Sequence, residues 1–133
     1  MNPPFIVMSL AIGVGGALGS MLRYWCSFLI ARTFGETFPL GTLFVNVVGS
    51  FLIVLFAEVT GPDGRLLVSS LARQFVMVGI FGGYTTFSSF SLQTLNLALH
   101  NEWMPALVNV ALSLLLCLVG AWLGHVAGVA LNR

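Results

Sequence analysis

The sequence predicts an all-α integral membrane protein, because charge is scarce, hydrophobicity is high and apolar residues occur in runs long enough to cross a bilayer. The 133 residues are 58% hydrophobic and 7% charged, with a mean hydropathy of +1.01. Soluble chains carry about 25% charged residues. Five basic and four acidic side chains cannot coat a 14.2 kDa globule in water. Lipid is therefore the expected solvent.

Polar residues divide the chain into four apolar segments, since a bilayer core of about 30 Å needs about 20 residues per helix. The spans are expected at about 4–30, 40–59, 71–99 and 103–131. The connection over 60–65 is short, so residues 1–133 are expected to form a single four-helix transmembrane domain. The first segment is expected to be a retained span, because it has no positively charged start and no clear cleavage signal.

An even number of spans places both termini on the same side of the membrane. Arg65, Arg73 and Arg133 then lie on the side of the termini, against Arg32 on the far side. This weak bias favours cytoplasmic termini and leaves insertion in both orientations open. The net charge of +1, without a basic run, makes nucleic acid a poor partner.

Small residues four apart indicate how the helices meet. Gly15 and Gly19 form one such pair, and Gly120, Gly124 and Gly128 form a double one. In lipid this spacing is typical of closely packed helix backbones. Such packing leaves little room for a lumen, so a pore would lie between chains and a conducting protein would be an oligomer.

The stretch over 79–91, in the middle of the third span, combines two adjacent glycines with a dense group of hydroxyl residues. Glycine costs up to about 1 kcal/mol relative to alanine in a helix, so we expect the third helix to be broken here. Freed backbone groups at membrane depth are tolerated where they line a polar cavity, and broken helices use them to bind ions. The alternative is that the hydroxyls bond to the preceding turn and only bend the helix.

Two aromatic residues share a face of this span. Phe87 and Phe90 are three apart, and the hydroxyls of Thr86 and Ser89 form a second stripe beside them. An aromatic ring has a positive edge, which can contact an anion without the full charge that would trap it. Core packing is the alternative for the two rings.

Carboxamides and one arginine add polar groups to the other spans. Asn46 lies in the second span, and Asn109 lies in the fourth with Ser113 one turn later. They are interpreted either as interhelical hydrogen bonds or, with the hydroxyl stripe, as a neutral track rich in donors. Arg23 could extend to an interface or favour anions in a vestibule.

Acidic residues and histidines are absent from the centres of the predicted spans: Glu58 and His125 lie near span ends. A proton relay or a drug-cation exchanger would need a central carboxylate. The sequence also shows no hydrolytic triad, phosphate loop or metal-ligand cluster, so the protein is not expected to be an enzyme.

Three motifs together resemble the CrcB/Fluc family of fluoride channels. They are GALGSMLRY over 16–24, GTLFVNVVGS over 41–50 and GGYTTFSSFS over 82–91. The resemblance covers all four spans in order. It implies an antiparallel, dual-topology homodimer with fluoride pores at the subunit interface, which passively releases cytoplasmic fluoride across the cell (inner) membrane.

The resemblance also implies roles for single residues. Phe87 and Phe90 would line the pores, with Asn46 beside them; Asn109 and Ser113 would belong to the polar track of the last helix. The position of Asn109 is often a tyrosine in the family, so this chain departs from the pattern there.

Two further roles follow from the same resemblance. Arg23 would lie in a vestibule. A structural Na⁺ would be held at the centre of the dimer by the backbone carbonyls of Gly82 and Thr85.

A fluoride channel in contact with lipid is therefore the predicted function. A small multidrug exporter is the alternative with the same number of spans, but its usual central carboxylate is missing. A non-conducting structural membrane subunit is the other alternative, and for it the hydroxyls of residues 85–91 would be surplus.

Overall fold

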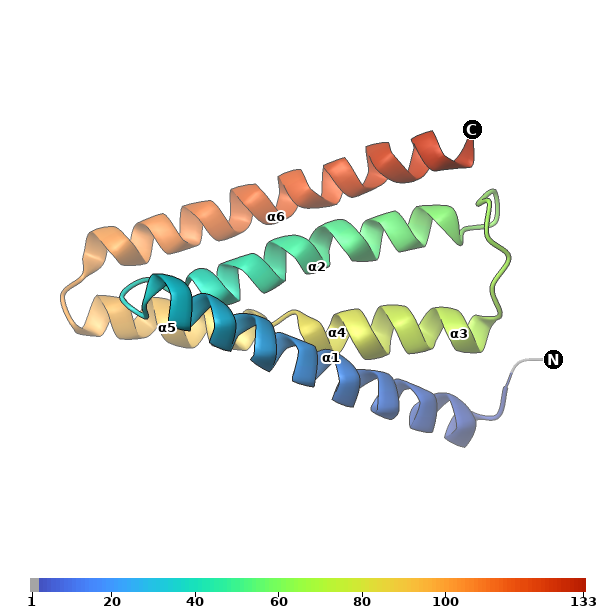
Figure 1. The fold of residues 1–133 in the computed structure, drawn as a ribbon, viewed down its shortest axis with the longest axis horizontal. Helices are drawn as coiled ribbons and strands as arrows, with labels where there is room; N and C mark the ends of the chain where they lie inside the picture. The colour runs from blue at the N-terminus through green and yellow to red at the C-terminus, as the bar shows by residue number, and fades with distance from the viewer. Residues whose placement is uncertain (1–2) are drawn as a thin grey trace.

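The computed structural model describes residues 3–133, which form helices joined by short connections (Figure 1). The elements are α1 (Phe5–Phe34), α2 (Leu40–Val59), α3 (Ser70–Gln74), the π-helix η1 (Phe75–Phe81), α4 (Gly82–Tyr84), α5 (Phe87–Leu99) and α6 (Trp103–Asn132). Within the described chain, four helical stretches are long and apolar enough to cross a membrane, with 70–99 counted as one. The predicted all-helical, four-span architecture is confirmed, although α1 continues to Phe34 instead of ending near Ile30.

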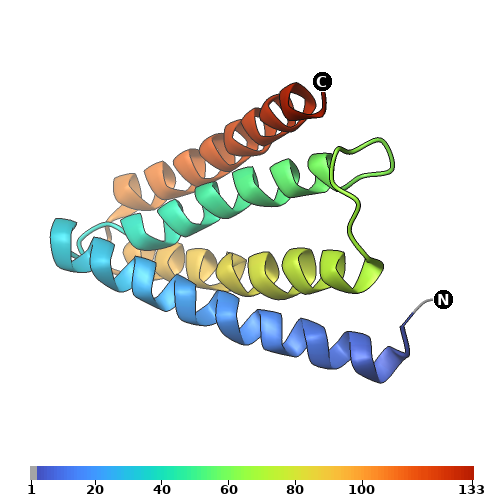
Figure 2. The ribbon, with the colours of Figure 1, turned by 45° about the vertical axis from the view of Figure 1, so that its right-hand side comes forward.

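The four spans run up and down between two ends of the bundle. The start of α1, the C-terminus and the α2–α3 connection lie at one end, and the α1–α2 and α5–α6 connections lie at the other (Figures 1 and 2). The first and last spans therefore begin and end at the same end of the bundle, as an even number of spans predicts. The break in the third span, between α4 and α5, lies well inside the bundle along its length (Figure 1).

Glycines bring α1 into backbone contact with the third span. A Cβ added at Gly15 would lie 2.5 Å from the Phe75 carbonyl oxygen, and one added at Gly83 would lie 2.5 Å from the Gly16 carbonyl oxygen. Both neighbours are backbone atoms, which cannot move aside as a flexible side chain can. The first GxxxG pair is thus used for helix packing, as its spacing predicts.

The double glycine repeat of α6 packs on α2 in the same way. Gly120, Gly124 and Gly128 are all buried, and a Cβ at Gly120 would lie 3.0 Å from the Val47 carbonyl oxygen. The equivalent atom at Gly124 would meet the Phe51 carbonyl. The α2–α6 pair is therefore a close backbone-to-backbone interface along much of its length.

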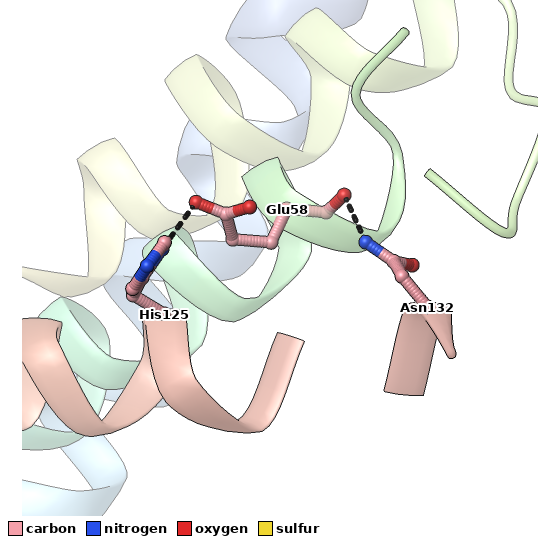
Figure 3. Close-up of polar contacts among 3 residues, drawn as sticks. All are labelled: Glu58, His125 and Asn132. Carbon is pink, nitrogen blue, oxygen red and sulfur yellow. Dashed lines mark hydrogen bonds and ion pairs between the residues drawn. The ribbon is translucent and has the colours of Figure 1, made fainter. Parts of the chain in front are cut away.

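Polar contacts hold the ends of α2 and α6 together near the C-terminus (Figure 3). The Glu58 carboxylate lies 2.7 Å from Nδ1 of His125, and Nδ2 of Asn132 donates to the Glu58 carbonyl at 3.1 Å. The Asn132 side-chain oxygen accepts from the Arg65 N–H at 3.0 Å. These contacts place Glu58 and His125 at the end of the bundle, in agreement with their predicted position at span ends.

Candidate functional site

The third span breaks at Thr85 and Thr86, which are both extended, with φ/ψ of −82°/158° and −156°/111°. The predicted break is therefore confirmed within the polar stretch. Gly82 and Gly83, however, remain helical and precede the break. Gly83 is needed for its close approach to Gly16, so this glycine contributes to helix packing.

The carboxamide of Asn46 on α2 replaces the helical hydrogen bonds lost at the break. Its Oδ1 accepts from the Thr86 N–H at 2.7 Å, and its Nδ2 donates to the Thr86 carbonyl at 3.0 Å. In an uninterrupted helix the Thr86 N–H would bond to the Gly82 carbonyl. Asn46 therefore forms interhelical hydrogen bonds, and it forms them at the break in the third span.

Thr86 also starts the next helix. Its Oγ1 accepts from the Ser89 N–H at 3.2 Å, the usual arrangement of an N-cap residue. The hydroxyls of Ser89 and Ser88 lie 3.0 Å and 3.2 Å from the same oxygen. The predicted hydroxyl stripe of Thr86 and Ser89 is thus a hydrogen-bonded cluster at the start of α5.

Other hydroxyls of the stretch bond to the preceding turn. Thr85 Oγ1 donates to the Phe81 carbonyl and Ser91 Oγ to the Phe87 carbonyl, both at 2.9 Å. Both interpretations of the polar stretch are therefore realised, each by different residues.

Phe87 and Phe90 lie against each other on one face of α5, as their spacing predicts. Their ring centroids are 5.2 Å apart, with an interplanar angle of 47°. Phe90 is 9% exposed, whereas Phe87 is 73% exposed. The pair therefore extends from the interior of the protomer to its surface.

Asn109 and Ser113 form an internal polar chain between α6 and α5. Asn109 is 1% exposed and donates to Thr94 Oγ1 at 2.9 Å, and Ser113 Oγ lies 3.5 Å from Asn109 Oδ1. Thr94 in turn donates to the Phe90 carbonyl at 2.7 Å. Sequence reasoning missed Thr94; its signal is a hydroxyl one turn after Phe90.

A cavity of about 680 Å³ lies at the end of the bundle opposite the termini, lined by α1, α2, α5 and their connections. Its lining includes Thr42, which is buried, and Gln93, three residues after Phe90. Within residues 3–133, the Gln93 Oε1 atom is buried without a hydrogen-bond partner. Gln93 is a second polar residue that sequence reasoning did not single out.

Arg23 reaches the break from α1. Its Nη1 lies 3.5 Å from the Thr85 carbonyl oxygen, and the side chain is partly buried. A guanidinium near the start of α5 adds positive charge to a region that is otherwise neutral.

The carbonyls of Gly82 and Thr85 suit a hard cation. Each has lost its helical donor, because the Thr86 N–H is directed to Asn46 and the Ser89 N–H to Thr86 Oγ1. Carbonyls of an opened helix are typical ligands of Na⁺. The Arg23 guanidinium contacts the same Thr85 oxygen, so a bound cation would share that carbonyl with it.

The fold and the site together define a multi-pass membrane protein with a polar helix break beside an aromatic pair. The family described as "CrcB-like protein, Camphor Resistance (CrcB)" matches residues 10–125 of the chain. The chain belongs to this family.

Related proteins match nearly the whole chain. The "Fluoride-specific ion channel FluC" of Opitutus terrae is 60% identical over 92% of this chain and 93% of the relative. The protein of the same name from Rhodospirillum rubrum is 57% identical over 93% of this chain and 96% of the relative. That of Paramagnetospirillum magneticum is 54% identical over 92% and 95%, respectively.

Proposed function

We propose that this protein is a fluoride-selective channel that passively releases cytoplasmic fluoride across the inner membrane and so relieves fluoride toxicity. Family membership and the names of relatives that are 54–60% identical support fluoride as the ion. The structural observation that carries the proposal is the break at Thr85 and Thr86, where uncharged donors and an aromatic pair meet inside a span. Conduction through such a path needs no catalytic turnover.

The chemistry of the site suits a small, strongly hydrated anion. A pore must replace the donors of water while holding the ion loosely enough for it to leave. Asn46 and Asn109 each use one amide N–H within the protomer, and each carboxamide has a second N–H. With the ring edges of Phe87 and Phe90, these groups offer positive dipoles without a full charge.

We propose that the pores form between two antiparallel copies of the chain, inserted in both orientations. Phe87 is 73% exposed in one protomer, although its partner Phe90 is buried. Gly82, whose carbonyl is freed at the break, is exposed as well. A second copy would cover both residues and complete the wall that one protomer leaves open.

A structural Na⁺ at the dimer centre is part of the same proposal. One protomer supplies the carbonyls of Gly82 and Thr85, and a symmetric second copy would double this set of oxygens. When bound, Na⁺ would supply a fixed positive charge that offsets the carbonyl dipoles. Arg23 would add a vestibule charge close to this position.

Fluoride efflux from liposomes tests the function directly. Purified protein in vesicles loaded with fluoride should release it rapidly when the membrane potential is clamped, and vesicles loaded with chloride should retain their ion. Ion-selective electrodes measure both, with protein-free vesicles as the control. Well-folded protein that releases neither ion, or both equally, would contradict the proposal.

Removing sodium tests the cation site. Replacing Na⁺ by N-methylglucamine in the buffer should lower the melting temperature of the protein in detergent, because the carbonyls of Gly82 and Thr85 lose their counter-charge. The same exchange applied to a Gly13→Ala variant should lower its melting temperature by a similar amount, since a Cβ at this α1 position would meet nothing within 4 Å. A melting temperature independent of Na⁺ would remove the ion from the proposal.

A further inference from the structure

We infer that Asn46 is a positioning residue that holds the helix break open, and that it thereby couples the aromatic pair of the anion path to the carbonyl pair of the cation site. This inference rests on the proposed function but goes beyond a role for Asn46 as a pore-lining donor. Its carboxamide bonds to both backbone groups of one residue, Thr86, across 40 positions of the chain.

The first step concerns the carbonyl pair. The Thr86 N–H has two possible acceptors, the Gly82 carbonyl in a continuous helix and Asn46 Oδ1 in the broken one. The observed distance of 2.7 Å to Oδ1 shows that Asn46 takes this donor. The Gly82 carbonyl oxygen then has no helical donor and is free to bind another ligand. The acceptor atom of Asn46 is therefore what makes this oxygen available.

The second step concerns the aromatic pair. Asn46 Nδ2 holds the Thr86 carbonyl at 3.0 Å, while Thr86 Oγ1 caps α5 through the Ser89 N–H. Phe87 is the first residue of α5. The donor atom of Asn46 thus fixes the start of the helix that carries Phe87 and Phe90.

The two atoms of the carboxamide therefore have separable tasks, and two substitutions separate them. Asn46→Leu keeps the volume but removes both bonds, so the Thr86 N–H loses its acceptor and the break is no longer held in place. Asn46→Asp keeps an acceptor for the Thr86 N–H but removes the donor to the Thr86 carbonyl. Ser50→Ala is the matched control, because Ser50 lies one turn away on α2 and donates only to the Asn46 backbone carbonyl.

We call the two hydrogen bonds between Asn46 and Thr86 the clamp. Hydrogen exchange of the Thr86 amide, measured by NMR in lipid nanodiscs, tests the clamp without relying on ion flux. In Asn46→Leu we expect exchange at Thr86 to rise about tenfold, the scale of one lost hydrogen bond. The Na⁺ concentration that gives half of the thermal stabilisation should also rise about tenfold, by the same reasoning. Asn46→Asp and Ser50→Ala should keep the exchange rate and the Na⁺ concentration of the parent. Fluoride efflux should fall in Asn46→Leu and Asn46→Asp but not in Ser50→Ala.

The outcomes separate this inference from the proposed function. If the Leu variant keeps Thr86 protection and Na⁺ dependence, the clamp is wrong and Asn46 acts only on the ion. If the Leu variant does not fold, the Thr86 carbonyl shift in Asn46→Asp decides: an unchanged ¹³C shift overturns the clamp. If the parent protein moves no fluoride, the proposed function fails, but the exchange rates still decide whether Asn46 holds the break.

Discussion

Gly15→Ala should lower the stability of the protein by about 3 kcal/mol or more, at the upper end of the usual cost of overpacking. The added Cβ would lie 2.5 Å from the Phe75 carbonyl oxygen and 3.0 Å from the Gly79 Cα. Both are backbone atoms of η1, so relief requires α1 and the third span to move apart. Thermal unfolding of the detergent-purified variant, followed by circular dichroism, measures the loss.

Gly13→Ala provides a matched control two residues away on the same helix. A Cβ at Gly13 would meet nothing within 4 Å. Because alanine is favoured over glycine in a helix by up to about 1 kcal/mol, this variant should be as stable as the parent or slightly more stable. Equal losses in both variants would show that the close approach of α1 to η1 is not the cause of the loss in Gly15→Ala.

Phe87→Ile should reduce fluoride efflux about fivefold while leaving the protein folded. Isoleucine has no polarised ring edge, and an aromatic contact contributes about 1 kcal/mol; since about 1.4 kcal/mol changes a rate tenfold, losing it changes the rate about fivefold. The side chain is 73% exposed in the protomer, so protomer packing should change little. Efflux from liposomes and elution of the variant as a single species are the two measurements.

Phe5→Ile is the control, because Phe5 is 85% exposed but lies at the start of α1, far along the chain from the break. Its efflux should match that of the parent. Phe90→Ile should differ from both, since Phe90 is 9% exposed and its loss should also lower the melting temperature. Parent-like efflux in Phe87→Ile would remove the exposed ring from the ion path.

The spans could be predicted from the sequence because lipid requires long apolar runs, which composition reveals directly. The break could also be located to within a few residues. Its exact position could not, because glycine flexibility and glycine packing have the same sequence signal. Gly83 packs against Gly16 while remaining helical, and the extended backbone follows at Thr85 and Thr86.

The partners of the polar side chains were harder to predict than their presence. Asn46, Asn109 and Arg23 could be singled out because polar groups inside a span are costly. Whether an amide bonds to a neighbouring helix or to an ion depends on the register between helices, which one sequence does not contain. The Asn46–Thr86 bonds and the role of Thr94 as the partner of Asn109 therefore required the structure.

Asn132 hydrogen-bonds the last turn of α6 to α2 and to the connection at Arg65. The C-terminal end of the chain therefore has a fixed place at one end of the bundle. A reporter fused after Arg133 would therefore mark that end of the bundle in every molecule. In sealed vesicles, a protease added outside would trim all such reporters, or none, if the chain inserts one way. It would trim about half if, as proposed, the population is mixed, so one gel lane could distinguish the two.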